Sequence, residues 1–120
     1  MEPKILYRAA VEQVPSELYL LPIGKAEVLK TGSDLTIISY GRRLYDCMEA
    51  INAASQVLPG TRTELIDLRT IYPWDRATVF DSVAKTGRAM VVHESMVNAG
   101  LVRSLLLQFR RSPFSTYKHQ

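Results

Sequence analysis

The chain has 120 residues, of which 47% are hydrophobic and 22% are charged, a composition typical of one small globular domain. No apolar run approaches the roughly 20 residues that a membrane-spanning helix needs, so we expect no membrane contact. The formal net charge is +3, but residues 1–100 hold 11 basic and 12 acidic side chains, whereas residues 101–120 hold four basic side chains and no acidic one. The domain therefore lacks the basic surface of a nucleic-acid-binding protein, and we expect no nucleic-acid partner.

Residues 1–34 are predicted to form an extended interdomain linker that lies along a surface. Regular structure is interrupted there by three prolines, Pro3, Pro15 and Pro22. Glu2 directly follows Met1, and the segment has neither the apolar core of a secretory signal nor the acid-free character of a transit segment. The single cysteine, Cys47, excludes an internal disulfide and fits a reducing compartment.

The first core strand is predicted at residues 35–39, where the sequence Leu-Thr-Ile-Ile-Ser is β-branched and mostly apolar. A turn at residues 40–41 leads into a helix at about residues 42–58. Pro59 and Gly60 end this helix. Its apolar face is expected to consist of Leu44, Met48, Ile51 and Leu58.

Residues 63–75 combine a strand, a polar turn and the start of a helix. Leu65, Ile66 and Leu68 give a short apolar run of strand length, and we predict a strand at residues 63–68. Pro73 cannot continue a strand interior. Asp75 is suited to begin the next helix, because its carboxylate can accept hydrogen bonds from the unpaired amides of the first turn.

The second helix is predicted at about residues 76–85. Trp74 and Val79 have the spacing of a hydrophobic staple at its start. A third short apolar strand follows at residues 89–92. After a loop, an apolar helical pattern returns near residues 101–109.

Three short apolar strands that alternate with helices are typical of a parallel sheet covered on both faces. We therefore predict an α/β fold with three layers, αβα, and a parallel sheet of at least three strands. Ligands and partners of such sheets meet the carboxyl ends of the strands. In this chain those ends are residues 39–41, 69–70 and 93–94.

Three charged side chains at that edge are candidates for a binding site. Arg69 could bind a carboxylate or a phosphate through its planar guanidinium, or it could form a structural ion pair. His93 and Glu94 could act as an acid–base pair or be ordinary strand-end residues, and no nucleophile or metal-ligand spacing accompanies them. The structural alternative is the preferred one for all three. The nucleotide-binding patterns G-x-G-x-x-G and G-x-x-x-x-G-K-[ST] are missing, and we assign no catalytic, cofactor-binding or metal-binding residue.

Two stretches of the sequence resemble one known family. IDLRTIYPWD, residues 66–75, resembles the C-terminal domain of the β subunit of thiamine-dependent 2-oxoacid dehydrogenases, a domain of the transketolase C-terminal type. EPKILYRAAVEQVPSELYLLPIGKAEVLKTGSDLTIISYG, residues 2–41, is similar to the branched-chain member of that family rather than to the pyruvate member. We expect the resemblance to cover residues 2–100.

The resemblance implies part of an enzyme. In the family, thiamine diphosphate is held between an α subunit and the N-terminal domain of the β subunit, and the family's G-D-G fingerprint for diphosphate and magnesium does not occur in this chain. The implied partners for decarboxylation of branched-chain 2-oxoacids are the α subunit, a second β subunit and the acyltransferase core. The resemblance places Glu94, with Arg69 and His93 nearby, on a partner-binding surface. It implies the mitochondrial matrix in a eukaryote and the cytoplasm otherwise.

The chain is accordingly divided into three parts. These are an extended linker (1–34), a partial transketolase C-terminal-like domain (35–100) and a divergent basic tail (101–120). The tail keeps a helical apolar pattern without the family's residues, which suggests an altered reading frame or splice after Gly100. Three functions remain open: a fragment of a branched-chain dehydrogenase β subunit, a fragment of a pyruvate dehydrogenase β subunit, or a non-catalytic interaction domain or non-functional truncated product.

Overall fold

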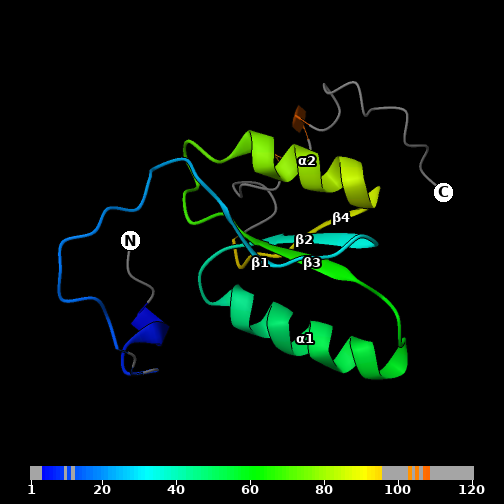
Figure 1. Cartoon of the computed structure of the whole chain (residues 1–120), viewed down its shortest axis with the longest axis horizontal. Helices are drawn as coiled ribbons and strands as arrows, with labels where there is room; N and C mark the ends of the chain where they lie inside the picture. The colour runs from blue at the N-terminus through cyan, green and yellow to red at the C-terminus, as the bar shows by residue number, and fades with distance from the viewer. Residues whose placement is uncertain are drawn as a thin grey trace.

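The computed structural model describes residues 4–9, 11, 13–95, 103, 105, 107 and 108. A short 3₁₀ helix, η1, precedes four strands and two helices (Figure 1). Their bounds are η1 Lys4–Leu6, β1 Glu27–Lys30, β2 Leu35–Ser39, α1 Arg43–Val57, β3 Thr63–Asp67, α2 Arg76–Thr86 and β4 Ala89–Val91. Within the predicted pattern at residues 101–109, the four described residues have helical backbone, and the others lie outside the described residues. No helix in the described part of the chain is long and apolar enough to span a bilayer.

The four strands form one sheet in the order β1-β3-β2-β4. β2 pairs in parallel with β3, from Leu35 opposite Thr63 to Ser39 opposite Asp67. β2 also pairs in parallel with β4, where Thr36 lies opposite Ala89. The three predicted core strands therefore lie side by side and parallel, which confirms the α/β prediction.

β1 was not predicted, because it falls within the segment that we expected to be an irregular linker. It pairs antiparallel with β3 and forms one edge of the sheet. Its sequence Glu-Val-Leu-Lys gives a weak strand pattern, since Val28 and Leu29 both remain exposed and neither face of the strand is clearly apolar. The regular domain therefore extends at least to Glu27 on its N-terminal side.

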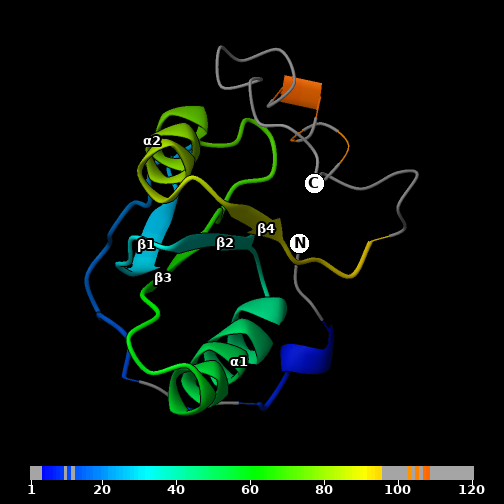
Figure 2. The same cartoon turned by 90° about the vertical axis from the view of Figure 1, so that its right-hand side faces the viewer.

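The two helices cover opposite faces of the sheet and make three layers (Figure 2). Successive strand residues point to opposite faces, so Ile37 and Leu65 pack beneath α1 whereas Ile38 and Ile66 pack beneath α2. The core on the α1 face consists of Ile37, Cys47, Ile51 and Leu65. The core on the α2 face consists of Ile38, Ile66, Leu68, Trp74, Val79 and Leu105.

One residue of the predicted apolar face of α1 lies outside the core. Leu58 is 61% exposed, because α1 ends at Val57 and the chain turns away before Leu58 can reach the sheet. Ile51 is buried and Leu44 and Met48 are partly buried, as predicted. Burial raises the pKa of the Cys47 thiol, which fits an unreactive core side chain.

The start of α2 matches the sequence prediction closely. A carboxylate oxygen of Asp75 accepts from the backbone N–H of Thr78 at 3.2 Å. Trp74 and Val79, the two staple residues, are buried in the same core. Gly87 ends the helix with φ 70°, a left-handed conformation that glycine adopts at little cost.

Candidate functional site

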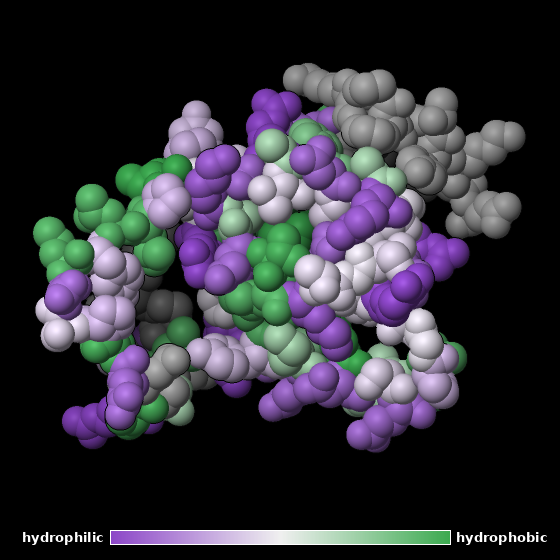
Figure 3. Space-filling view, viewed as in Figure 1, coloured by the Kyte–Doolittle hydropathy of each residue, from purple (hydrophilic) through white to green (hydrophobic). Residues whose placement is uncertain are grey.

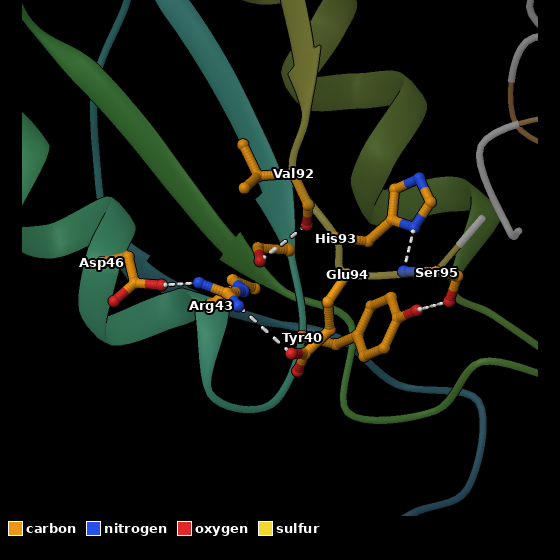
Figure 4. A network of polar contacts seen from close by, with 8 residues as sticks. Tyr40, Arg43, Asp46, Val92, His93, Glu94 and Ser95 are labelled. Carbon is orange, nitrogen blue, oxygen red and sulfur yellow. Dashed lines mark hydrogen bonds and ion pairs between the residues drawn. The ribbon is translucent and has the colours of Figure 1, made fainter. Parts of the chain in front are cut away.

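The carboxyl ends of β2, β3 and β4 meet at one edge of the sheet, as the parallel order requires. The side chains there divide into two groups. His93 and Glu94, which follow β4, lie beside Tyr40 and Arg43, which follow β2 (Figure 4). Arg69, which follows β3, turns toward β1 instead. The structure therefore brings together two of the three predicted site residues and separates the third.

Arg43 is the central cation of the group that Figure 4 shows. Its guanidinium contacts the carboxylate of Asp46 at 2.6 Å and the carboxylate of Glu94 at 3.2 Å. Hydrogen bonds to Asp46 and Glu94 raise the pKa of Arg43 above its usual value. The candidate Glu94 is therefore held by the arginine that begins α1, while about half of the Glu94 side chain remains exposed.

The turn at residues 93–95 is fastened to the end of β2. The backbone N–H of Ser95 donates to Nδ1 of His93 at 3.0 Å, and the hydroxyls of Tyr40 and Ser95 lie 3.3 Å apart. One residue earlier on each strand, the Ser39 hydroxyl donates to the carbonyl of Val92 at 2.9 Å. Because His93 and Glu94 bond to different partners, the pair does not have the arrangement of a catalytic acid and base.

Arg69 has a structural role in this conformation. Its φ is 53°, in the left-handed region, and its N–H donates to a carboxylate oxygen of Asp67 at 2.9 Å. The guanidinium forms an ion pair with Glu27 of β1. Glu27 therefore pairs with the guanidinium group that an anionic ligand would bind.

Two more hydrogen bonds join the same segments. The N–H of Gly24 donates to the Thr70 hydroxyl at 3.1 Å, and the N–H of Ala26 donates to the Asp75 carboxylate at 3.1 Å. Together with the Arg69–Glu27 ion pair they form what we call the clasp, which fixes residues 24–27 to the turn between β3 and α2. Burial raises the pKa of Asp75, but hydrogen bonds from Thr78 and Ala26 outweigh it, so the net pKa is lowered and the carboxylate remains ionised.

Neither group of side chains fits a diphosphate or a metal ion. Both arginines at the edge are paired with carboxylates of this chain. Within the described ranges, no three histidine, cysteine, aspartate or glutamate side chains converge as a metal site would require.

A buried acidic residue at the opposite end of the sheet escaped the sequence analysis. Glu64 is 2% exposed, forms an ion pair with Lys85 and accepts from the N–H of Gly32 at 3.2 Å. Burial raises the pKa of Glu64. Hydrogen bonds from Lys85, Ser82 and Gly32 and the charge of Lys85 lower this pKa by a larger amount, so the net pKa is below the ordinary value. Glu64 belongs to β3 and Lys85 to α2, so this ion pair helps to hold α2 against the sheet.

The sequence analysis also missed Arg43 and Ser95 as neighbours of Glu94. A usable signal was present, because the first turn of a helix that follows a parallel strand lies at the carboxyl edge of the sheet. Arg43 with Asp46 three residues later is a helix-surface ion pair at that place. The contact between Tyr40 and Ser95 has no comparable sequence signal, since it depends on the path of the turn after β4.

Residues 24–118 match the family of the transketolase C-terminal domain. The match includes residues 101–118, so our expectation that the resemblance would end near Gly100 was wrong. The one observation that still favours an altered reading frame or splice is the basic charge of residues 101–120, which contain no acidic side chain. The first matched residue, Gly24, is also the first residue of the clasp.

The β subunit of a mitochondrial 2-oxoisovalerate dehydrogenase from Chaetomium thermophilum is 62% identical over 113 residues, which are 94% of this chain and 24% of that protein. The β subunit of the pyruvate dehydrogenase E1 component from Mycoplasma genitalium is 50% identical over 95 residues, 79% of this chain and 28% of that protein. A split-gene transketolase, solved as an inactive beta4 tetramer, has a similar fold with a TM-score of 0.72 and 25% identity, covering 86% of this chain and 34% of that one. The chain thus spans about a quarter of the length of the curated relatives it matches.

Proposed function

The chain belongs to the transketolase C-terminal domain family, and on that premise we propose that it is part of the β subunit of a branched-chain 2-oxoacid dehydrogenase. The supporting observation is the 62% identity to the 2-oxoisovalerate dehydrogenase β subunit, over 94% of this chain. The pyruvate dehydrogenase relative is less similar and covers less of the chain, with 50% identity over 79%. The segment from Lys4 to Pro15, which favours the branched-chain member, supports the same choice.

The contribution of this part is to assembly and docking. Thiamine diphosphate, held elsewhere in the parent enzyme, supplies the carbanion stabilisation that 2-oxoacid decarboxylation needs. The charged residues at the carboxyl edge of this domain are paired with one another, which supports a surface role. The partners are the α subunit, a second β subunit and the acyltransferase core, and Glu94, His93 and Arg69 are the residues proposed to face them. The name of the Chaetomium relative supports a mitochondrial location.

A further part of the proposal is pairing between copies of this chain. The split-gene transketolase, a quarter identical in sequence, is a beta4 tetramer, and this chain covers 34% of its chain, so one longer chain that contains this fold associates with copies of itself. We extend that behaviour to the present chain. It corresponds to the contact with a second β subunit in the parent assembly.

Reconstitution tests the enzyme proposal. The purified chain is mixed with a branched-chain α subunit and the cofactor-binding N-terminal part of the β subunit. Co-elution and thiamine-dependent decarboxylation of 3-methyl-2-oxobutanoate are then measured. The mixture should be active and the chain alone inactive. Glu94→Gln should weaken binding of the acyltransferase core without loss of decarboxylation, whereas Asp81→Asn, at an exposed acidic residue of α2, should change neither.

Three results would contradict the proposal. Turnover of a 2-oxoacid by the chain alone would show catalytic groups within it. A preference of the mixture for pyruvate would favour the pyruvate dehydrogenase alternative. Failure to bind either component would favour a non-catalytic interaction domain or a non-functional product.

A further inference from the structure

The imidazole of His93 closes the turn that follows β4. The backbone N–H of Ser95 donates to Nδ1 of His93 at 3.0 Å (Figure 4). The ring of atoms that this hydrogen bond closes contains the N–Cα and Cα–C bonds of Glu94, so the hydrogen bond restricts the φ and ψ of that residue. Asparagine and aspartate side chains fix turns in the same way when they accept from an N–H two residues later. The conformation of Glu94 is therefore tied to an acceptor atom on its neighbour.

The chain before this turn is held by the sheet. The N–H of Val92 donates to the carbonyl of Ile38 at 3.0 Å, and the hydroxyl of Ser39 donates to the carbonyl of Val92 at 2.9 Å. The path of residues 93–95 then depends on side-chain contacts. Among these contacts, the hydrogen bond to His93 is the one that lies within the turn itself.

Opening of the turn leaves the folded core intact. Val91 packs against the core on the α2 face and Val92 against the core on the α1 face, whereas His93 is partly exposed and residues 94–95 are exposed. Figure 3 shows hydrophobic residues between the two helices, where Figure 1 draws the sheet, and hydrophilic residues around them. A change confined to residues 93–95 therefore exposes little apolar surface and costs little global stability.

The hydrogen bond within the turn depends on protonation. A neutral imidazole has one N–H donor and one acceptor nitrogen. Because Nδ1 of His93 accepts, the proton of the neutral ring is on Nε2. An imidazolium carries a proton on both nitrogens and has no acceptor, so a second proton at Nδ1 displaces the N–H of Ser95. Histidine is the side-chain type whose charge ordinarily changes between about pH 5 and 8.

The other charged and titratable side chains around the turn come from three places. Tyr40 follows β2, Arg43 and Asp46 belong to α1, and Glu94 lies in the turn itself (Figure 4). Arg43 remains a cation, because hydrogen bonds to Asp46 and Glu94 raise its pKa. Among the side-chain types in this cluster, the imidazole is therefore the one through which a change of pH near neutrality acts.

We infer that His93 is a proton-sensitive lock on Glu94, closed while the imidazole is neutral and open once it is protonated. The opening concerns the conformation of this chain alone. Its consequence for binding rests on the partner-facing role proposed for Glu94 above. A carboxylate that is fixed before association loses less conformational entropy on binding than a mobile one, so binding at Glu94 weakens at acidic pH.

Water-exchange NMR of the isotope-labelled chain tests the lock. The quantity measured is the protection factor of the Ser95 amide, which corrects for the intrinsic dependence of exchange on pH. It is compared at about pH 8 and about pH 5, the limits between which histidine titrates. In the wild type the protection factor should fall by about threefold to tenfold, in step with the protonation of His93 that its ring signals report.

Two substitutions of His93 hold the lock in one state each. His93→Asn keeps an acceptor at the equivalent δ position and does not bind a proton in this pH range, so Ser95 should stay protected throughout. His93→Leu has a similar size and no acceptor, so Ser95 should be unprotected throughout. His119→Gln removes the second histidine of the chain and should behave as the wild type. The circular dichroism should be the same for all four proteins.

Binding of the acyltransferase core to the reconstituted enzyme gives the second readout. Between about pH 8 and about pH 5 the affinity of the wild type should fall by a similar factor, about threefold to tenfold. The affinity of His93→Asn should stay constant over this range. The affinity of His93→Leu should be low at both pH values.

The lock is overturned if the protection of Ser95 in the wild type does not change with pH, or if it falls equally in His93→Asn. If the turn opens as expected while binding of the core does not respond to the His93 variants, the lock stands and the partner-facing role of Glu94 is wrong. The decarboxylation assay decides the enzyme proposal independently of both.

Discussion

The guanidinium of Arg43 lies 3.2 Å from the carboxylate of Glu94 and so joins the start of α1 to the turn after β4. Both side chains are substantially exposed. Exposed ion pairs add little to global stability. The value of this one is positional, because it holds the carboxylate that we propose to face a partner.

Arg43→Met is expected to loosen the turn at residues 93–95 without unfolding the domain. Loss of the guanidinium removes one of the contacts that hold the turn, and the bonds from Tyr40 and Ser95 remain. Hydrogen–deuterium exchange should therefore show a faster amide at Ser95 while Tm stays close to that of the wild type. Arg42→Met, which removes an equal charge one residue earlier, should leave the exchange of Ser95 unchanged, and an equal effect of both variants would argue against this role.

Lys85→Met is expected to destabilise the domain in a pH-dependent way. Glu64 is almost completely buried, so loss of its cation leaves a buried carboxylate with only neutral donors. Breaking a fully buried pair costs about 3–5 kcal/mol, and we expect about 2 kcal/mol because half of the Lys85 side chain is exposed. Urea unfolding at neutral pH measures this difference.

The pH dependence of that difference follows from the lowered pKa of Glu64. A carboxyl whose folded pKa is depressed adds stability that is present above its ordinary value of 4.5 and is lost as pH falls through the lowered pKa. The difference between wild type and Lys85→Met should therefore be largest near pH 7 and shrink below pH 4.5. Lys85→Arg should retain most of the stability, and a difference that stays constant with pH would show that Lys85 acts through packing alone.

Asp75→Ala is expected to cost about 1–2 kcal/mol, since it removes the cap of α2 and leaves the N–H of Ala26 without its acceptor. The lowered pKa means that this stability is present above the ordinary value of 3.8 and is lost as pH falls below it. Denaturant unfolding at several pH values gives the measurement. Asp81→Ala, an exposed position of the same helix, should change stability little, and an equal loss in both variants would contradict the capping role.

The sequence was sufficient for the strands and helices whose residues follow a clear pattern. β2 and β3 are buried on both faces, so their apolar residues stand out. Asp75 marks the start of α2 because its side chain caps the helix, and Gly87 marks the end because its left-handed conformation favours glycine. β1 gave no such signal, because an edge strand of four residues with both apolar side chains exposed resembles an extended linker.

For the site, the sequence could predict which strand ends lie at the same edge of the sheet, but not which side chains contact one another there. The parallel order placed His93 and Glu94 at the correct edge, but their actual partners depend on the path of the turns. Arg69 illustrates the limit: its ion pair is with Glu27, which lies on the strand that the sequence did not reveal. Glu64 was missed for a related reason, since the role of a charged residue within a strand becomes clear only once its contact with Lys85 of α2 is known.

Substitution of Arg69 separates the backbone from the side chain at the clasp. Its φ of 53° is costly for any residue with a Cβ atom and nearly free for glycine. Arg69→Ala loses the ion pair with Glu27 and keeps the backbone cost, whereas Arg69→Gly loses the ion pair and relieves that cost. Urea unfolding should therefore find Arg69→Gly more stable than Arg69→Ala by about 1 kcal/mol.

Glu27→Gln isolates the ion pair, whose loss should cost at most about 1 kcal/mol because both side chains are partly exposed. If Arg69→Ala proves the more stable of the two, the left-handed conformation is not retained in solution.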